Sequence, residues 1–111
     1  MSFNPVFIRD KGEIERLKRR GRKLSGRYFY LRFVRDERGP RFVISVSTKY
    51  DKRAVKRNHI RRQVKEILRQ GAKDGAYPMN IAVAIMPLQT KGDIEFTSLR
   101  DDLLSMLNKI R

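Results

Sequence analysis

Apolar residues recur at helical spacing in the first part of the chain. The segment Lys11 to Arg20 predicts a helix, with Asp10 as its N-cap and Gly21 as its C-terminal stop. Ile14 and Leu17 stand three residues apart, which places them on one face of that helix.

Two segments with a two-residue period follow. From Arg27 to Arg35, apolar residues including Phe29 alternate with polar or amphipathic ones, which is typical of a half-buried strand. Asp36 to Pro40 predicts a turn, and Arg41 to Thr48 predicts a second strand. We expect the two strands to form an antiparallel pair.

The second half of the chain predicts a helix, a strand and a helix. Ala54 to Gln70 carries an aliphatic stripe at helical spacing, and Gly71 is a candidate C-cap. Met79 to Met86 is nearly all apolar, which favours a central strand covered by helices. Thr97 or Ser98 would cap a last helix that runs to about Lys109, with these residues facing the core: Leu99, Leu103, Leu104, Leu107 and Ile110.

This order, α-β-β-α-β-α, predicts a small α+β fold, a two-layer sandwich formed as a single domain over residues 1–111. The helix 54–70 joins two strands, which makes a βαβ crossover if those strands are neighbours. No apolar run approaches the roughly 20 residues needed to cross a bilayer. The N-terminus lacks a secretory apolar region and cysteine is absent, so we expect a cytoplasmic protein.

Positive charge is concentrated in the first part of the chain. The formal net charge is +15, from 27 Lys and Arg against 12 Asp and Glu. Residues 1–69 contain 22 basic and 7 acidic side chains, whereas residues 70–111 contain 5 of each. A charge added only for solubility would not stop at one point, so the asymmetry indicates a surface that binds a polyanion, with nucleic acid as the default partner.

The predicted helix 54–70 and the segment before it form the main candidate surface. An outward arc of guanidinium and ammonium groups beside the aliphatic stripe would bind phosphate oxygens. The candidate RNA-binding residues are Lys49, Lys52, Arg53, Lys56, Arg57, Asn58, His59, Arg61, Arg62, Lys65 and Arg69.

Three alternative roles for this helix remain open. A solvated face would normally mix Glu with Lys at i,i+4, and here only Asp51 and Glu66 oppose the basic residues. A membrane-surface helix would need the narrow aliphatic stripe that the core also needs. A DNA-binding helix would need base-reading side chains, for which Asn58 or Gln63 are candidates.

The first strand offers a second candidate surface. Tyr28 and Tyr30 are expected on the face opposite Phe29, where together with Arg32 they would line a groove for single-stranded nucleic acid. The alternative is that this face packs under a helix.

Groups for protein-based hydrolysis of a phosphodiester are scarce. His59 is the only histidine, and Asp101 and Asp102 are adjacent on a helix, so their side chains diverge. We therefore expect no catalytic side chain and no metal bound by the protein alone.

The segment Arg41 to Arg69 resembles the signature of the bacterial ribonuclease P protein subunit. That signature is a strand ending in Ser-Val-Ser-Lys-Lys, a helix start Ala-Val-x-Arg-Asn-Arg-x-Lys-Arg, and an Arg-Glu near the middle of the helix. The positions in register are Ser45, Val46, Ser47, Lys49, Ala54, Val55, Arg57, Asn58, Ile60, Arg62 and Glu66.

The sequence also departs from this signature. His59 stands where the family has Arg, Arg61 where it has Lys, and Thr48 where a second Lys is common. Tyr50-Asp51 replaces the usual Val-Gly. Two phenylalanines of the family's first helix correspond to Ile14 and Lys18.

The resemblance implies an α+β sandwich with a left-handed βαβ crossover. It implies a protein that assists a catalytic RNA in removing the 5′ leader of precursor tRNA, with Mg²⁺ acting in the ribonucleoprotein complex. The implied partners are the catalytic RNA and precursor tRNA, with no membrane and no protein partner. The implied leader-binding cleft contains Ile14, Lys18, Tyr28, Tyr30 and Arg32. The alternative is a general RNA-binding or ribosome-associated protein without a role in cleavage.

Overall fold

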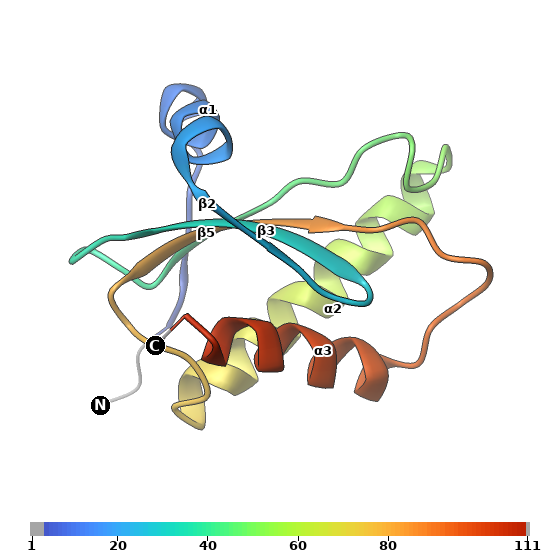
Figure 1. Ribbon diagram of the computed structural model, residues 1–111. Coiled ribbons are helices and arrows are strands. Elements are labelled where there is room, and N and C mark those ends of the chain that lie inside the picture. The colour runs from blue at the N-terminus through green and yellow to red at the C-terminus, as the bar shows by residue number, and fades with distance from the viewer. Residues whose placement is uncertain (1–3, 111) are drawn as a thin grey trace.

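The computed structural model describes residues 4–110, which form one five-stranded sheet and three helices (Figure 1). The helices are α1 (Lys11–Arg20), α2 (Ala54–Lys73) and α3 (Phe96–Asn108). The strands are β1 (Val6–Phe7), β2 (Arg22–Ser25), β3 (Phe29–Arg35), β4 (Arg41–Ile44) and β5 (Ile81–Pro87). The α+β class is confirmed, and two short strands, β1 and β2, add to the predicted order.

Strand β5 lies at the centre of the sheet, whose order is β1-β4-β5-β3-β2. The prediction that 27–35 and 41–48 pair with each other is wrong, because β5 lies between β3 and β4. Strand β3 is antiparallel to β5 and β4 is parallel to it. The most apolar strand takes the position that is covered on both faces. Because β4 and β5 are parallel neighbours joined by α2, the βαβ crossover is present.

The two faces of the sheet are covered unequally. Helices α2 and α3 lie against one face, and α1 crosses the other (Figure 1). The main core lies under α2 and α3, where Phe29 and Leu31 of β3 and Val83 of β5 are fully buried. A smaller cluster lies under α1, where Leu17 packs with Ala82 and Ala84 of β5. Because α1 is short, it leaves part of the sheet face that it crosses uncovered.

Helix α1 begins and ends as its sequence predicts. The carboxylate of Asp10 accepts a hydrogen bond from the Glu13 amide at 2.9 Å, which satisfies one free N–H of the first turn. At the other end the Gly21 amide donates to the Leu17 carbonyl at 2.9 Å. Gly21 is buried against β3, where a Cβ would meet the Phe33 amide nitrogen at 2.9 Å.

Helix α2 continues past the predicted end at Gly71. This glycine lies inside the helix, where an added Cβ would meet Leu104 at 2.7 Å and the ring of Tyr77 at 2.8 Å. The residue is therefore small to let α3 and Tyr77 approach, and not to cap the helix. Just beyond the end of the helix, Gly75 has a left-handed backbone with a φ of 65°.

Helix α3 begins two or three residues earlier than predicted. Its N-cap is Glu95, which makes no side-chain capping bond, so the capping roles assigned to Thr97 and Ser98 are wrong. Leu99, Leu103, Leu107 and Ile110 are buried as expected; Leu104 is only partly buried, and Met106 takes a buried position. Over residues 4–110, none of the helices has the length and apolar character to cross a membrane.

Candidate nucleic-acid interface

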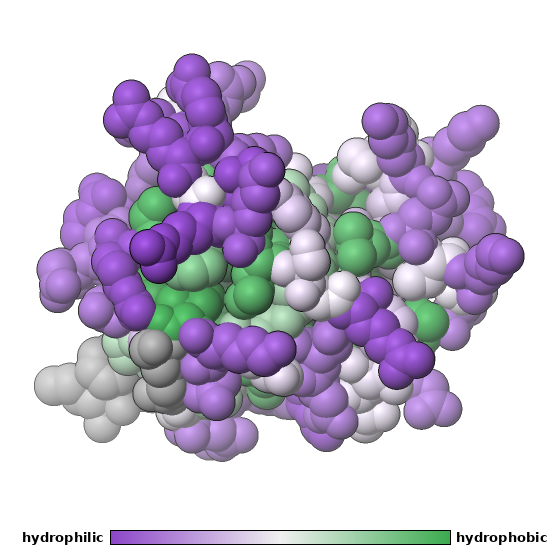
Figure 2. Space-filling model, in the orientation of Figure 1, coloured by the Kyte–Doolittle hydropathy of each residue, from purple (hydrophilic) through white to green (hydrophobic). Residues whose placement is uncertain are grey.

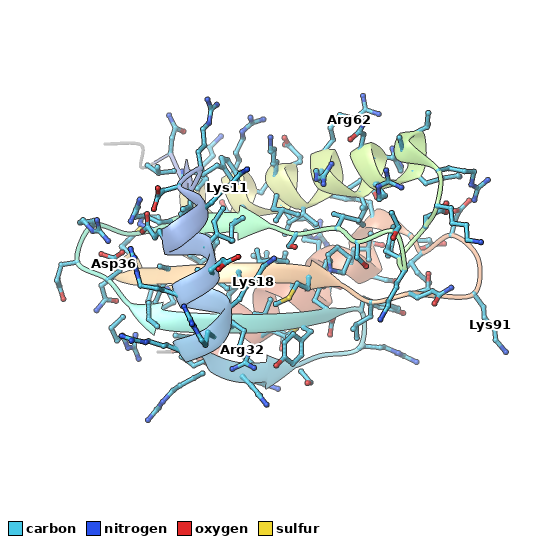
Figure 3. All side chains as sticks on the ribbon, turned by 90° about the horizontal axis from the view of Figure 1, so that it is seen from above. Lys11, Lys18, Arg32, Asp36, Arg62 and Lys91 are labelled. Carbon is cyan, nitrogen blue, oxygen red and sulfur yellow. The ribbon has the colours of Figure 1, made fainter. Side chains whose placement is uncertain are left out.

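The outer ridge of α2 carries exposed polar and basic side chains. Asn58, Arg62 and Arg69 are exposed there, while the opposite side of the helix is buried in the core. Arg62 has no ion-pair partner within residues 4–110, and Figure 3 shows it pointing away from the sheet. Arg69 lies 3.8 Å from the Glu66 carboxylate. The ridge therefore presents at least one guanidinium free to take a phosphate.

One flank of α2 carries half-buried cations that also support the fold. Arg57 donates through Nη1 to the carbonyls of Asp51 at 2.9 Å and Lys52 at 2.8 Å, which ties the preceding turn to the helix. Arg61 donates to the side-chain oxygen of Asn58 at 3.1 Å. The Lys65 ammonium lies 5.2 Å from the ring centroid of Phe7 in β1. These contacts hold the cations on the same side of the molecule.

The turn before α2 contains both free and paired cations. Lys49 and Lys52 are exposed, and neither has an ion-pair partner in the described part of the chain. Arg53 instead donates to both carboxylate oxygens of Asp51, at 3.1 and 3.0 Å. Hydrogen bonding from Arg53 lowers the pKa of Asp51 to about 2, so the carboxylate is ionised at neutral pH.

The other flank of α2 faces a cavity of about 290 Å³ beside the loop 88–94. Lys56 and His59 line this cavity together with Gln63. The Lys56 ammonium lies 3.7 Å from the Asp93 carboxylate. The predicted single arc is thus divided between an outer ridge, a flank beside β1 and a flank on the cavity.

Four of the five predicted leader-cleft residues gather on the face crossed by α1. Ile14 packs in the cluster under α1, and the Lys18 ammonium donates to the Ser45 hydroxyl at 2.8 Å. The Arg32 guanidinium donates to the Gly21 carbonyl at 2.9 Å and lies 5.8 Å from the ring centroid of Tyr30. In Figure 3, where the molecule is seen from above, Lys18 and Arg32 are both drawn at α1. This face therefore combines apolar, aromatic and cationic groups.

Tyr28 is the exception. It packs against the core under α2 and α3 and lines the cavity beside His59. Strand β3 begins at Phe29, so the two-residue alternation does not extend back to Tyr28. The placement of Tyr28 on the face opposite Phe29 is wrong.

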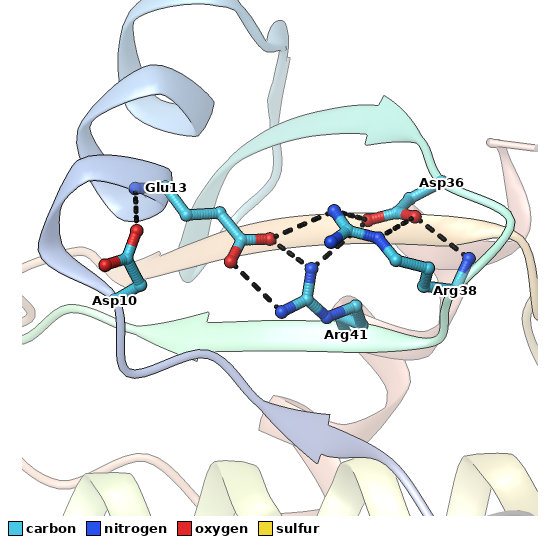
Figure 4. Close-up of polar contacts among 5 residues, drawn as sticks. All are labelled: Asp10, Glu13, Asp36, Arg38 and Arg41. Carbon is cyan, nitrogen blue, oxygen red and sulfur yellow. Dashed lines mark hydrogen bonds and ion pairs between the residues drawn. The ribbon is translucent and has the colours of Figure 1, made fainter.

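An ion-pair cluster that the sequence did not indicate anchors α1. Arg41 of β4 donates to both oxygens of Glu13, one of them at 3.0 Å, and lies 3.4 Å from Asp36 (Figure 4). Arg38 also donates to Asp36, which lowers the pKa of that carboxyl. Arg41 and Glu13 are 16% and 20% exposed, so the pair is largely shielded from solvent. The cluster fixes the start of α1 to the sheet, at the point where β3 ends and β4 begins.

The two adjacent carboxylates of α3 contact other groups of the protein. Asp102 accepts hydrogen bonds from the backbone amides of Arg27 at 3.1 Å and Tyr28 at 2.8 Å. Asp101 is exposed and lies 3.3 Å from Arg100. Over residues 4–110, no three His, Cys, Asp or Glu side chains are grouped so as to hold a metal ion.

The sequence of this chain is similar to those of known proteins. The family model described as Ribonuclease P matches residues 4–111. This chain belongs to the Ribonuclease P family. The ribonuclease P protein component of Carboxydothermus hydrogenoformans is 32% identical, over 95% of this chain and 90% of that protein. That of Finegoldia magna is 30% identical, over 94% of this chain and 89% of that protein.

A solved ribonuclease P structure has the same fold. The RNase P protein from Thermotoga maritima superposes with a TM-score of 0.82 at 25% identity, covering 94% of this chain and 96% of that chain. On this fold, three departures from the ribonuclease P signature lie together. Tyr50, Asp51 and His59 all line the cavity between α2 and the loop 88–94.

Proposed function

We propose that this protein is the protein subunit of ribonuclease P, which binds the catalytic RNA and the 5′ leader of precursor tRNA and promotes leader removal. The observation that carries the proposal is the α2 surface on a fold of this family: Arg62 on the helix has an unpaired guanidinium, and the turn before the helix carries the free ammonium groups of Lys49 and Lys52. On the face seen in Figure 2, hydrophilic side chains project from α1 and from the N-terminal end of α2.

The catalytic RNA is the proposed ligand of the α2 ridge. A duplex-rich RNA presents closely spaced phosphates, and neutralising them with Lys and Arg releases condensed counterions. A helix anchored by buried aliphatic residues such as Ile60 and Val64 holds its cations at fixed spacing, so little side-chain and backbone order has to be gained on binding.

The leader is the proposed ligand of the face crossed by α1. Tyr30 supplies an aromatic ring, Arg32 and Lys18 supply donors, and Ile14 supplies an apolar surface. Unpaired nucleotides bind such surfaces through stacking and backbone contacts. Since Ile14 and Lys18 stand where the family has phenylalanines, binding here depends more on charge than on stacking from α1.

The proposal places the bond cleavage in the RNA subunit. Mg²⁺ belongs to the ribonucleoprotein complex in this scheme, because the carboxylates of residues 4–110 are dispersed or engaged in ion pairs and caps and do not form a ligand set. The protein residues contribute binding, orientation and positive charge near the RNA phosphates.

A reconstituted cleavage assay tests this function. Catalytic RNA of a bacterial ribonuclease P is incubated with precursor tRNA at low Mg²⁺, with and without the protein. We expect the protein to stimulate leader removal, and the complex to bind precursor tRNA more tightly than mature tRNA. Absence of stimulation at every protein concentration would reject the proposal. Stimulated RNA binding without preference for the precursor would instead indicate a general RNA-binding protein.

A further inference from the structure

The cavity beside α2 differs in chemistry from the phosphate-binding ridge. It has a volume of about 290 Å³ and lies between the N-terminal half of α2 and the loop 88–94. In Figure 1 this loop, which follows β5, lies at the same end of the molecule as the N-terminal end of α2. The volume is just below the range typical of small-molecule pockets, roughly 300–1,000 Å³. It suits a single small planar group and excludes a folded RNA helix.

The charges at the cavity cancel. Arg53 is held by two contacts to Asp51, and Lys56 lies 3.7 Å from Asp93. Both carboxylates line the cavity together with the two cations. A phosphate entering it would meet two carboxylates whose cationic partners are already engaged. The cavity is therefore poorly suited to an anion, although the surrounding surface is strongly basic.

The remaining lining groups suit a neutral aromatic ligand. Tyr28 and Tyr50 contribute aromatic rings, and His59 and Gln63 contribute hydrogen-bonding groups. Arg27 already lies 5.8 Å from the centroid of the Tyr28 ring, so we take Tyr50 as the principal stacking surface. Burial raises the pKa of Tyr50, and Asp51 and Asp93 raise it further, so its hydroxyl keeps its proton at neutral pH.

We propose that this cavity binds one unpaired nucleobase of the RNA partner, which stacks on Tyr50 and hydrogen-bonds to His59 and Gln63. The inference rests on the proposed function, because the RNA bound along the α2 ridge brings the base to the cavity. Bases have a π-face and polar edges, and a neutral, aromatic, hydrogen-bonding recess satisfies both. Three of the groups involved, Tyr50, Asp51 and His59, are those that replace the Val, Gly and Arg of the family signature.

The first test uses the full-length protein and the catalytic RNA at several salt concentrations. Tyr50→Ala should weaken binding by about tenfold, near the lower end of what one base–aromatic stack contributes. The slope of log affinity against log salt should stay unchanged, because every phosphate stays neutralised. Tyr50→Phe should restore most of the affinity. Wild-type affinity in Tyr50→Ala, or a shallower salt slope, would overturn the inference.

The second test does not depend on the folding of a variant. The four ribonucleosides, and separately inorganic phosphate at matched ionic strength, are titrated into the isotope-labelled wild-type protein. At least one nucleoside should give saturable chemical-shift changes at Tyr50, His59 and Gln63, whereas phosphate should not. Equal changes with phosphate, or none with any nucleoside, would contradict the base site.

The outcomes also separate this inference from the proposed function. If wild-type protein stimulates leader removal but Tyr50→Ala binds the catalytic RNA like wild type, only the base site fails. If the wild-type protein gives no stimulation, the proposed function fails, and the nucleoside titration still decides whether the cavity takes a base.

Discussion

Cations of the α2 surface differ in whether a carboxylate already holds them, and this difference predicts their contribution to RNA binding. Arg62 is exposed and has no ion-pair partner within residues 4–110. Arg53 is also exposed, but it makes two side-chain contacts to Asp51 near 3 Å. Replacing either residue by Ala removes one positive charge, so the two variants change the net charge equally.

The expected losses follow from the bonds available to each guanidinium. A hydrogen bond to a charged group contributes about 1.5–3 kcal/mol, so Arg62→Ala should weaken binding to the catalytic RNA roughly ten- to a hundredfold. The salt slope should fall by about 0.7–0.9 for each phosphate that is no longer neutralised. Arg53 would first have to leave Asp51, so Arg53→Ala should cost less than about threefold, with little change of slope.

Fluorescence anisotropy with labelled catalytic RNA over a range of salt concentrations measures both quantities. Lys109→Ala, which removes an exposed charge just after α3, serves as the matched control and should leave the slope unchanged. Circular dichroism checks that each variant is folded. An Arg53→Ala loss as large as that of Arg62→Ala would refute the reasoning, as would wild-type binding by Arg62→Ala.

Three predictions concern the scaffold of the site. Gly71→Ala should destabilise the protein by about 1–2 kcal/mol in urea unfolding, since the added Cβ meets a rigid buried ring. Gly12→Ala, whose Cβ makes only ordinary contacts in α1, should instead stabilise the protein by up to about 1 kcal/mol. Equal gains in stability for the two variants would contradict the packing argument. Because the pKa of Asp51 is lowered to about 2, its ionised carboxylate stabilises the protein above its unfolded pKa, and this stabilisation should be lost between about pH 4 and pH 2. Asp51→Asn should therefore reduce the fall in unfolding free energy over this pH range. An unchanged fall would count against the role of the Asp51 carboxylate. Glu13→Gln leaves Arg41 with Asp36, at 3.4 Å, as its remaining carboxylate, and should cost about 1–2 kcal/mol in the same unfolding assay. A loss within error would show that the pair does not anchor α1.

Local sequence patterns were sufficient for the main elements of the fold. The first helix agrees to the residue, with Asp10 as its cap, because capping and hydrophobic spacing act within one turn. The apolar run that became β5 correctly predicted a central strand. Strand partners were not predictable in the same way, since a two-residue period shows which face is buried but not which neighbour binds. The edge strand β2 has Leu24 as its one apolar residue, so its sequence shows no alternation of apolar and polar residues that would predict a strand.

In the candidate site, too, the sequence predicts local features but not the contacts between side chains. The basic character of α2 is evident from residue counts, but its pairing is not. Arg53 and Lys56 look equivalent to Arg62 in sequence, and only the folded positions of Asp51 and Asp93 distinguish them. The Lys56–Asp93 pair joins residues far apart in the chain, whereas Arg53 and Asp51 are only two residues apart. In both cases the folded conformation determines which cations remain available.

The account depends on RNA binding by the outer ridge of α2 and by the turn before this helix. The most direct measurement is reconstituted leader removal by a variant that lacks the free cations of both. We predict that wild-type protein stimulates cleavage of precursor tRNA at low Mg²⁺ and that a folded Arg62→Ala/Lys49→Ala/Lys52→Ala variant needs at least about tenfold more protein for the same rate. Equal stimulation by wild type and variant at equal protein concentration would contradict the account.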